Sequence, residues 1–98
     1  MKTIIDGLNK NFENRVRLGI MSALMVNNAL DFNNLKDLLG VTDGNLASHL
    51  KALEKHQLIQ ISKQFIGRKP NTTYSATELG RLSFKKHLNA LEQLLGGI

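Results

Sequence analysis

Two groups of side chains in this sequence have types and spacing suited to binding a polyanion. The first follows Thr42 in a stretch of helical periodicity and combines amide, hydroxyl and basic residues. Its members are Asn45, Ser48, His49, Lys51 and Lys55. The second is Arg68 with Lys69, placed between Gly67 and Pro70. Such side chains donate hydrogen bonds to phosphates and base edges, so their chemistry is binding.

Positive charge is concentrated in the second half of the chain. Residues 1–48 hold five bases and five acids, whereas residues 49–87 hold eight bases and two acids. The whole sequence has a net charge of +5. A basic region of this kind attracts a polyanion, and nucleic acid is the commonest one for a soluble domain. A solvated basic face without a ligand explains the charge alone equally well.

The first group lies in a predicted pair of crossing helices. Apolar periodicity predicts a core-facing helix over 14–26, capped by Asn14, and a very short strand over 30–32. Asn33 is expected to cap a helix that ends at Gly40, and Thr42 a helix over 43–56. The connection between these two helices is so short that they must cross rather than run parallel. This order predicts a helix-turn-helix.

The second group lies at the tip of a predicted hairpin. Residues 58–66 favour a strand with Ile59, Ile61 and Phe65 on one side, and residues 72–76 favour a return strand. Gly67, Pro70 and Asn71 are expected to break the pairing between them. Thr77 is expected to cap a final helix that runs to about Leu95.

Length and composition narrow the class of protein. At 98 residues, 1–98 is expected to be a single domain, and the absence of cysteine removes any disulfide or thiolate site. The most apolar stretch is too short for a membrane span, so we expect a cytoplasmic protein.

The histidines are far apart, and only His87 with Glu92 could begin a metal site. No nucleophile motif or phosphate-binding glycine loop occurs, so we expect no metal, no cofactor and no enzymatic activity.

Several stretches together resemble the small stand-alone winged-helix transcriptional regulators related to the MarR and ArsR groups. The resemblance covers nearly the whole chain and is carried by residues 16–21, 31–36, 42–54, 65–70 and 74–81. It implies a mainly α winged helix-turn-helix with a small β-hairpin wing, in a dimeric, sequence-specific DNA-binding protein. One departure is Gln57, where this family often has glycine. We expect Gln57 to adopt a left-handed conformation.

The resemblance and the helical geometry assign roles to residues. With the leucines of 43–56 buried, Gly44, Ser48, Lys51 and Lys55 point outward and can enter the major groove, flanked by Asn45. Asn45 can bind adenine through two hydrogen bonds, and Lys51 can reach a guanine edge or a phosphate. The amides from Thr42 to Gly44 can hold a phosphate, which the charge of Asp43 opposes. The wing, 66–71, is expected on the minor groove or backbone through Arg68 and Lys69.

The two ends of the chain suggest a dimer interface. Each end, within segments 1–13 and 78–98, is expected to form a helix, because its apolar residues recur at near-helical spacing. They are Ile4, Ile5, Leu8 and Phe12, and Phe84, Leu88, Leu91 and Leu95. The alternative is that the tail folds back on its own domain. A two-fold dimer would instead bury both ends and match a palindromic site.

Two hypotheses therefore come from the sequence. The first is a homodimeric transcriptional regulator on a palindromic double-stranded DNA operator. The second is a winged-helix protein–protein interaction module whose basic face binds an acidic partner. The sequence specifies neither the operator, the regulated genes, the direction of regulation nor a small-molecule effector.

Overall fold

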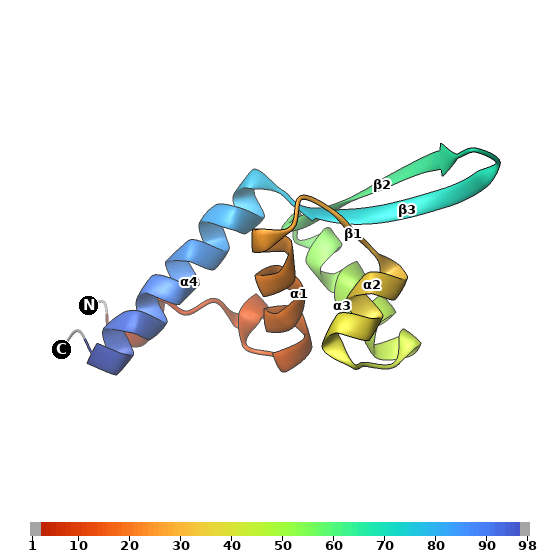
Figure 1. Cartoon of the computed structure of the whole chain (residues 1–98). Coiled ribbons are helices and arrows are strands. Elements are labelled where there is room, and N and C mark those ends of the chain that lie inside the picture. Colours follow the sequence, from red (N-terminus) through yellow and green to blue (C-terminus); the bar gives the residue numbers. More distant parts are fainter. Residues whose placement is uncertain (1–2, 97–98) are drawn as a thin grey trace.

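Four α-helices and a small antiparallel sheet make up the described part of the chain, residues 3–96 of a computed structural model (Figure 1). The element bounds are η1 (Ile4–Gly7), η2 (Lys10–Phe12), α1 (Arg15–Val26), β1 (Leu30–Asp31), α2 (Phe32–Leu39), α3 (Asp43–Lys55), β2 (Ile59–Ile66), β3 (Lys69–Ala76) and α4 (Glu78–Gly96). The predicted helix-turn-helix is α2 followed by α3, and the predicted hairpin is β2 with β3.

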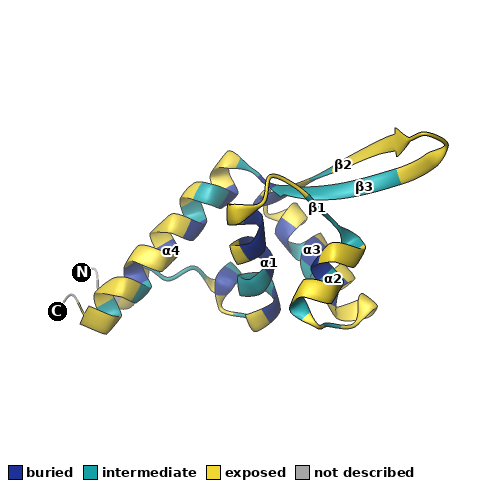
Figure 2. Cartoon of the chain, viewed as in Figure 1, coloured by how far each residue is buried: buried dark blue, intermediate teal, exposed yellow. Residues whose placement is uncertain are grey.

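The core lies between the first three α-helices and the base of the sheet (Figure 2). Its largest fully buried side chains are Phe12, Ile20, Met21, Leu24, Leu35, Leu46, Leu53 and Ile59. Because each helix contributes one apolar stripe, burying these stripes together fixes how the helices cross. The long helix α4 extends away from this core on one side, and the hairpin extends on the other (Figure 1).

Helix boundaries follow local capping. The Asn14 Oδ1 accepts hydrogen bonds from the amides of Val16 and Arg17 at 2.9 and 3.1 Å, as expected. The predicted cap at Asn33 is wrong, because the Asp31 Oδ1 accepts from the Asn34 amide at 2.7 Å and α2 begins two residues earlier. A carboxylate at this position also complements the helix dipole. Gly40, with φ of 63°, ends α2 as predicted.

The sheet has the order β1-β3-β2, with all neighbours antiparallel. The pairing of β2 with β3 runs from Ile59 opposite Ala76 to Ile66 opposite Lys69. Only Gly67 and Arg68 form the turn, and the positive φ of Gly67, 65°, fits a type II′ hairpin. The predicted break at Pro70 and Asn71 is therefore wrong. β3 tolerates proline at position 70 because β1 pairs with β3 only at Thr73 and Tyr74. At Pro70 the β1 side of β3 therefore behaves as an edge of the sheet, where proline is accepted.

A network of short contacts holds the base of the hairpin against α4. The Thr77 hydroxyl donates to the Gln57 carbonyl at 2.7 Å and accepts from the Gly80 amide at 2.9 Å. The Thr77 amide donates to the Leu58 carbonyl at 3.1 Å. Gln57 has a φ of 61°, which confirms the left-handed conformation predicted for it. This junction fixes where the hairpin leaves the body of the molecule.

The N-terminal segment differs from its prediction. Instead of one helix it forms two short 3₁₀ turns, η1 and η2, and η1 packs along α4 of the same chain. Phe12 and Phe84 are only 1% and 2% exposed, with ring centroids 5.1 Å apart in an edge-to-face arrangement. Their assignment to a dimer interface is corrected, because both rings are buried within one chain. The side chain of Ile4 and residues 1–2 and 97–98 lie outside the described part.

Candidate nucleic-acid interface

Three leucines orient α3. Leu46, Leu50 and Leu53 are buried, so the opposite side of the helix faces outward. On that side lie residues that are all exposed: Gly44, Asn45, Ser48, Lys51 and Lys55. The structure thus brings together, on one surface, the small, amide and basic residues that the sequence singled out.

The start of α3 carries an ion pair that sequence reasoning missed. The Thr42 Oγ1 caps the helix by accepting from the Asn45 amide at 3.2 Å. The Lys36 Nζ lies 2.8 Å from the Asp43 Oδ1, and this hydrogen-bonded carboxylate raises the pKa of Lys36. Both groups are exposed, so the pair adds little to stability. Its effect is electrostatic, because it offsets the negative charge that opposes an anion at this helix terminus.

The hairpin presents a second basic surface. Residues 62–70 are all exposed, and the outer end of the hairpin is yellow in Figure 2. Arg68 lies in the two-residue turn, and Lys69 follows it. Phe65 and Ile66 are 73% and 67% exposed, whereas Ile59, which was predicted to lie on the same side of the strand as Phe65, is buried. The hairpin extends beyond the helices, so its outer half has no core to cover.

Arg17 is a candidate that the sequence did not single out. It lies in the first turn of α1 and is half-buried, and its charge is near enough to His49 of α3 to affect the pKa of that imidazole. Burial, followed by the nearby Arg17 charge, lowers the pKa of His49. His49 is half-buried, unlike the exposed Ser48 and Lys51. Sequence spacing gives no signal for this pair, because it joins two helices.

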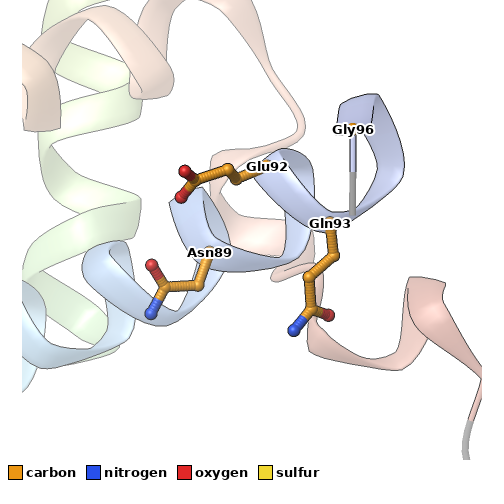
Figure 3. Close-up of a pocket in the computed structure, with 4 residues that line it drawn as sticks. All are labelled: Asn89, Glu92, Gln93 and Gly96. Carbon is orange, nitrogen blue, oxygen red and sulfur yellow. The ribbon is translucent and has the colours of Figure 1, made fainter. Parts of the chain in front are cut away.

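Hollows in the structure lie elsewhere. An open one of about 540 Å³ is bordered by four described residues of α4, Asn89, Glu92, Gln93 and Gly96. Figure 3 shows the side chains of the first three extending away from the helix. Another of about 310 Å³ lies between the N-terminal segment and α4. Among residues 3–96 we find no group of three or more metal-ligating side chains. The outward surface of α3 and the hairpin therefore hold the best candidate site.

Comparison with known proteins agrees with this geometry. The winged helix DNA-binding domain family matches residues 16–95. The chain belongs to this family. A further relative, an uncharacterised protein of Methanocaldococcus jannaschii, is 36% identical over 85 residues, which cover 87% of this chain and 92% of the relative. The winged-helix assignment therefore rests on nearly the whole sequence.

Solved structures support the same assignment. A transcriptional regulator homologue from Pyrococcus horikoshii OT3 superposes with a TM-score of 0.82 at 33% identity, covering 89% of this winged-helix chain and 86% of the other. A putative MarR-family regulator from Enterococcus faecalis V583 shares the fold, with a TM-score of 0.67 at 22% identity over 94% of this chain and 76% of that one. The chain is thus a winged-helix DNA-binding protein of the transcriptional-regulator type. Within the described residues, no helix has the length and apolar character needed to cross a bilayer.

Proposed function

We propose that this winged-helix protein is a homodimeric transcriptional regulator that binds a palindromic DNA operator. In this proposal α3 enters the major groove, where Asn45, Ser48 and Lys51 contact bases or phosphates. The turn at Arg68 and Lys69 lies on the adjacent minor groove or its backbone. The observation that carries the proposal is that one surface of α3 combines small, amide and basic residues while its other side is anchored by leucines.

The dimer proposal rests on α4. Leu88, Leu91 and Leu95 are spaced three and four residues apart, and Leu95 is 88% exposed. Ile5 on η1 is also exposed, and η1 packs along the same helix. An apolar stripe of this kind is buried when two copies pair about a two-fold axis. The two α3 helices would then lie about 34 Å apart, one turn of B-DNA.

DNA binding is tested by fluorescence anisotropy with a random duplex at several salt concentrations. We expect log affinity to fall steeply and linearly with log salt, because each phosphate contact releases counterions. An affinity that does not respond to salt would contradict the proposal. Selection of bound duplexes from a random pool should then return two inverted half-sites, one helical turn apart.

The dimer is tested with a matched pair of exposed leucines on α4. Leu95→Glu places a charge in the proposed interface, and Leu82→Glu places the same charge on the other side of the helix. We expect light scattering to give a dimer for the native chain and for Leu82→Glu, and a monomer for Leu95→Glu. A native monomer at micromolar concentration would contradict the dimer.

One observation favours the second function, a protein-interaction module. Phe65 and Ile66 are exposed at the end of the hairpin, and exposed apolar residues are common in protein interfaces. An acidic protein partner would compete with DNA for the basic hairpin. If a random acidic polypeptide bound as tightly as duplex at the same salt concentration, this second function would be preferred. In either case we propose that the protein acts in the cytoplasm.

A further inference from the structure

Arg17 carries a positive charge that nothing in the described chain satisfies. Its Nε is buried and has no hydrogen-bond partner. Within residues 3–96 its side chain makes neither a hydrogen bond nor an ion pair. A buried donor without an acceptor costs free energy, and native proteins rarely keep one without a reason. We therefore expect the hydrogen-bond acceptor of the Arg17 Nε to come from outside the chain.

The surroundings of Arg17 specify the charge of that acceptor. His49 lies close enough for the guanidinium to lower its pKa, after the larger effect of burial. The one ion pair among the described residues joins Lys36 to Asp43, so no carboxylate pairs with Arg17. The Arg17 guanidinium therefore lies near a second basic group, His49, and has no anionic partner among the described residues. A phosphate supplies the charge and the paired oxygens that a guanidinium binds best.

The position of Arg17 relates it to the candidate DNA surface. His49 lies one helical turn after Asn45, so the two residues share one side of α3, and α1 packs against α3. Arg17 therefore lies beside the helix proposed to enter the groove, where the sugar-phosphate backbone borders the bases. Part of the residue remains exposed, so a phosphate can approach the guanidinium from solvent.

We propose that Arg17 binds a DNA backbone phosphate beside α3 and that His49 forms part of the same contact. This inference rests on the proposed DNA-binding function and adds a contact from α1 to those of α3 and the hairpin. The contact is to the backbone because Arg17 is held on a helix behind the reading surface. It positions α3 in the groove and carries no base preference.

Arg17→Gln tests the contact, and Arg15→Gln is its matched control. Arg15 is an exposed arginine on the same helix, so both variants lose one charge and keep a side chain of similar length. Anisotropy should show that Arg17→Gln weakens the selected and the random duplex by the same factor, about tenfold. The slope of log affinity against log salt should become shallower by about 0.9, the amount expected for one phosphate. Arg15→Gln should change neither.

Stability measurements separate this role from a structural one. We expect Arg17→Gln to unfold at the same temperature as the native chain or higher, because it removes a positive charge that has no anionic partner among residues 3–96. If Arg17→Gln does not fold, Arg17→Lys takes its place. This variant keeps the charge, so the salt slope should stay native while the affinity falls because the forked guanidinium is lost.

Other outcomes would overturn the inference. These are equal affinities for Arg17→Gln and Arg15→Gln, a loss confined to the selected sequence, or a shift to monomer with DNA affinity per dimer unchanged. The last would indicate that Arg17 pairs with a second copy of the chain. If the native protein itself bound no duplex in a salt-dependent way, the proposed function would fail instead, so the two failures are distinguishable.

Discussion

The helix α3 and the hairpin of β2 and β3 carry the two basic surfaces, yet they are held in different ways. Three leucines anchor α3 to the core, and Thr42 caps its start. The outer half of the hairpin, residues 62–70, is wholly exposed and is held by pairing between its own strands. Reading bases needs positions fixed by packing, whereas following a backbone tolerates movement. Under the proposed function, we therefore expect sequence recognition to come mainly from α3.

The largest effect should come from removing an anchor of α3. Leu50→Ala is expected to lower the free energy of unfolding by about 2–5 kcal/mol, through lost burial and the cavity it leaves. The matched control is Phe65→Ala on the hairpin, which should change it by less than about 0.5 kcal/mol because that ring is exposed. Chemical denaturation measures both. Similar losses for the two variants would show that the hairpin is packed in solution.

A pair of helical glycines tests the junction at the base of the hairpin. A Cβ at Gly80 would overlap the Leu58 carbonyl, whereas a Cβ at Gly44 meets nothing within 4 Å. Gly80→Ala should therefore destabilise the protein by about 1–3 kcal/mol. Gly44→Ala should stabilise it by about 0.5–1 kcal/mol through helix propensity. Thermal unfolding measures both, and a stable Gly80→Ala would mean that the junction is looser than described.

Two alanine substitutions test whether α3 reads bases while the hairpin binds the DNA backbone. Asn45→Ala should relax preference at one base position by about 1–3 kcal/mol, because an amide that reads adenine is lost. Arg68→Ala should weaken all duplexes alike and make the salt dependence shallower. Binding to a set of single-base operator variants separates the two patterns. Equal losses on every sequence for Asn45→Ala would remove that residue from base reading.

Acid should act on the helical body and not on the hairpin, since residues 59–76 contain no histidine. Burial lowers the pKa of His87 and of His49 below the ordinary value of 6.5. The unfolded chain then binds more protons in this range, so stability is complete above about pH 6.5 and falls as pH decreases. In His87 the neutral Nδ1 accepts from the Asn9 amide at 2.9 Å, a bond that protonation removes.

Thermal unfolding from about pH 7.5 to about pH 5 measures this effect. His87→Gln removes the titrating ring and should give a flatter profile than the native chain. A native profile that is flat, or one that rises towards acid, would show that neither imidazole titrates below its ordinary range.

Sequence alone predicted the parts of the fold that local interactions determine. The periodicity of Leu46, Leu50 and Leu53 gave α3, and the caps Asn14 and Thr42 gave two helix starts, because these signals lie within a few residues. The structure of the N-terminal segment was not predicted correctly. Its apolar spacing suggested one helix, but Phe12 is instead buried against Phe84, a partner distant in sequence.

The sequence predicted which residues of α3 lie on the candidate surface, but it did not predict the contacts between helices around that surface. The outward residues of α3 follow from helical geometry once its leucines are buried. Strand alternation puts Phe65 on the same side as Ile59 but does not show that Phe65 is exposed, because the hairpin extends beyond the core. Arg17 beside His49, and Lys36 with Asp43, each join two helices. Such pairs depend on how the helices cross, which spacing along one helix does not specify.

The strand order places β2 at the outside of the sheet, and among residues 3–96 its outer edge pairs with no other strand. An eight-residue edge with Phe65 and Ile66 exposed offers free backbone groups to any similar strand. Concentrated samples lacking DNA should therefore begin to aggregate at this edge. Lys63 places a charge along it, and replacing that lysine with an apolar residue would lower solubility before it changed the fold.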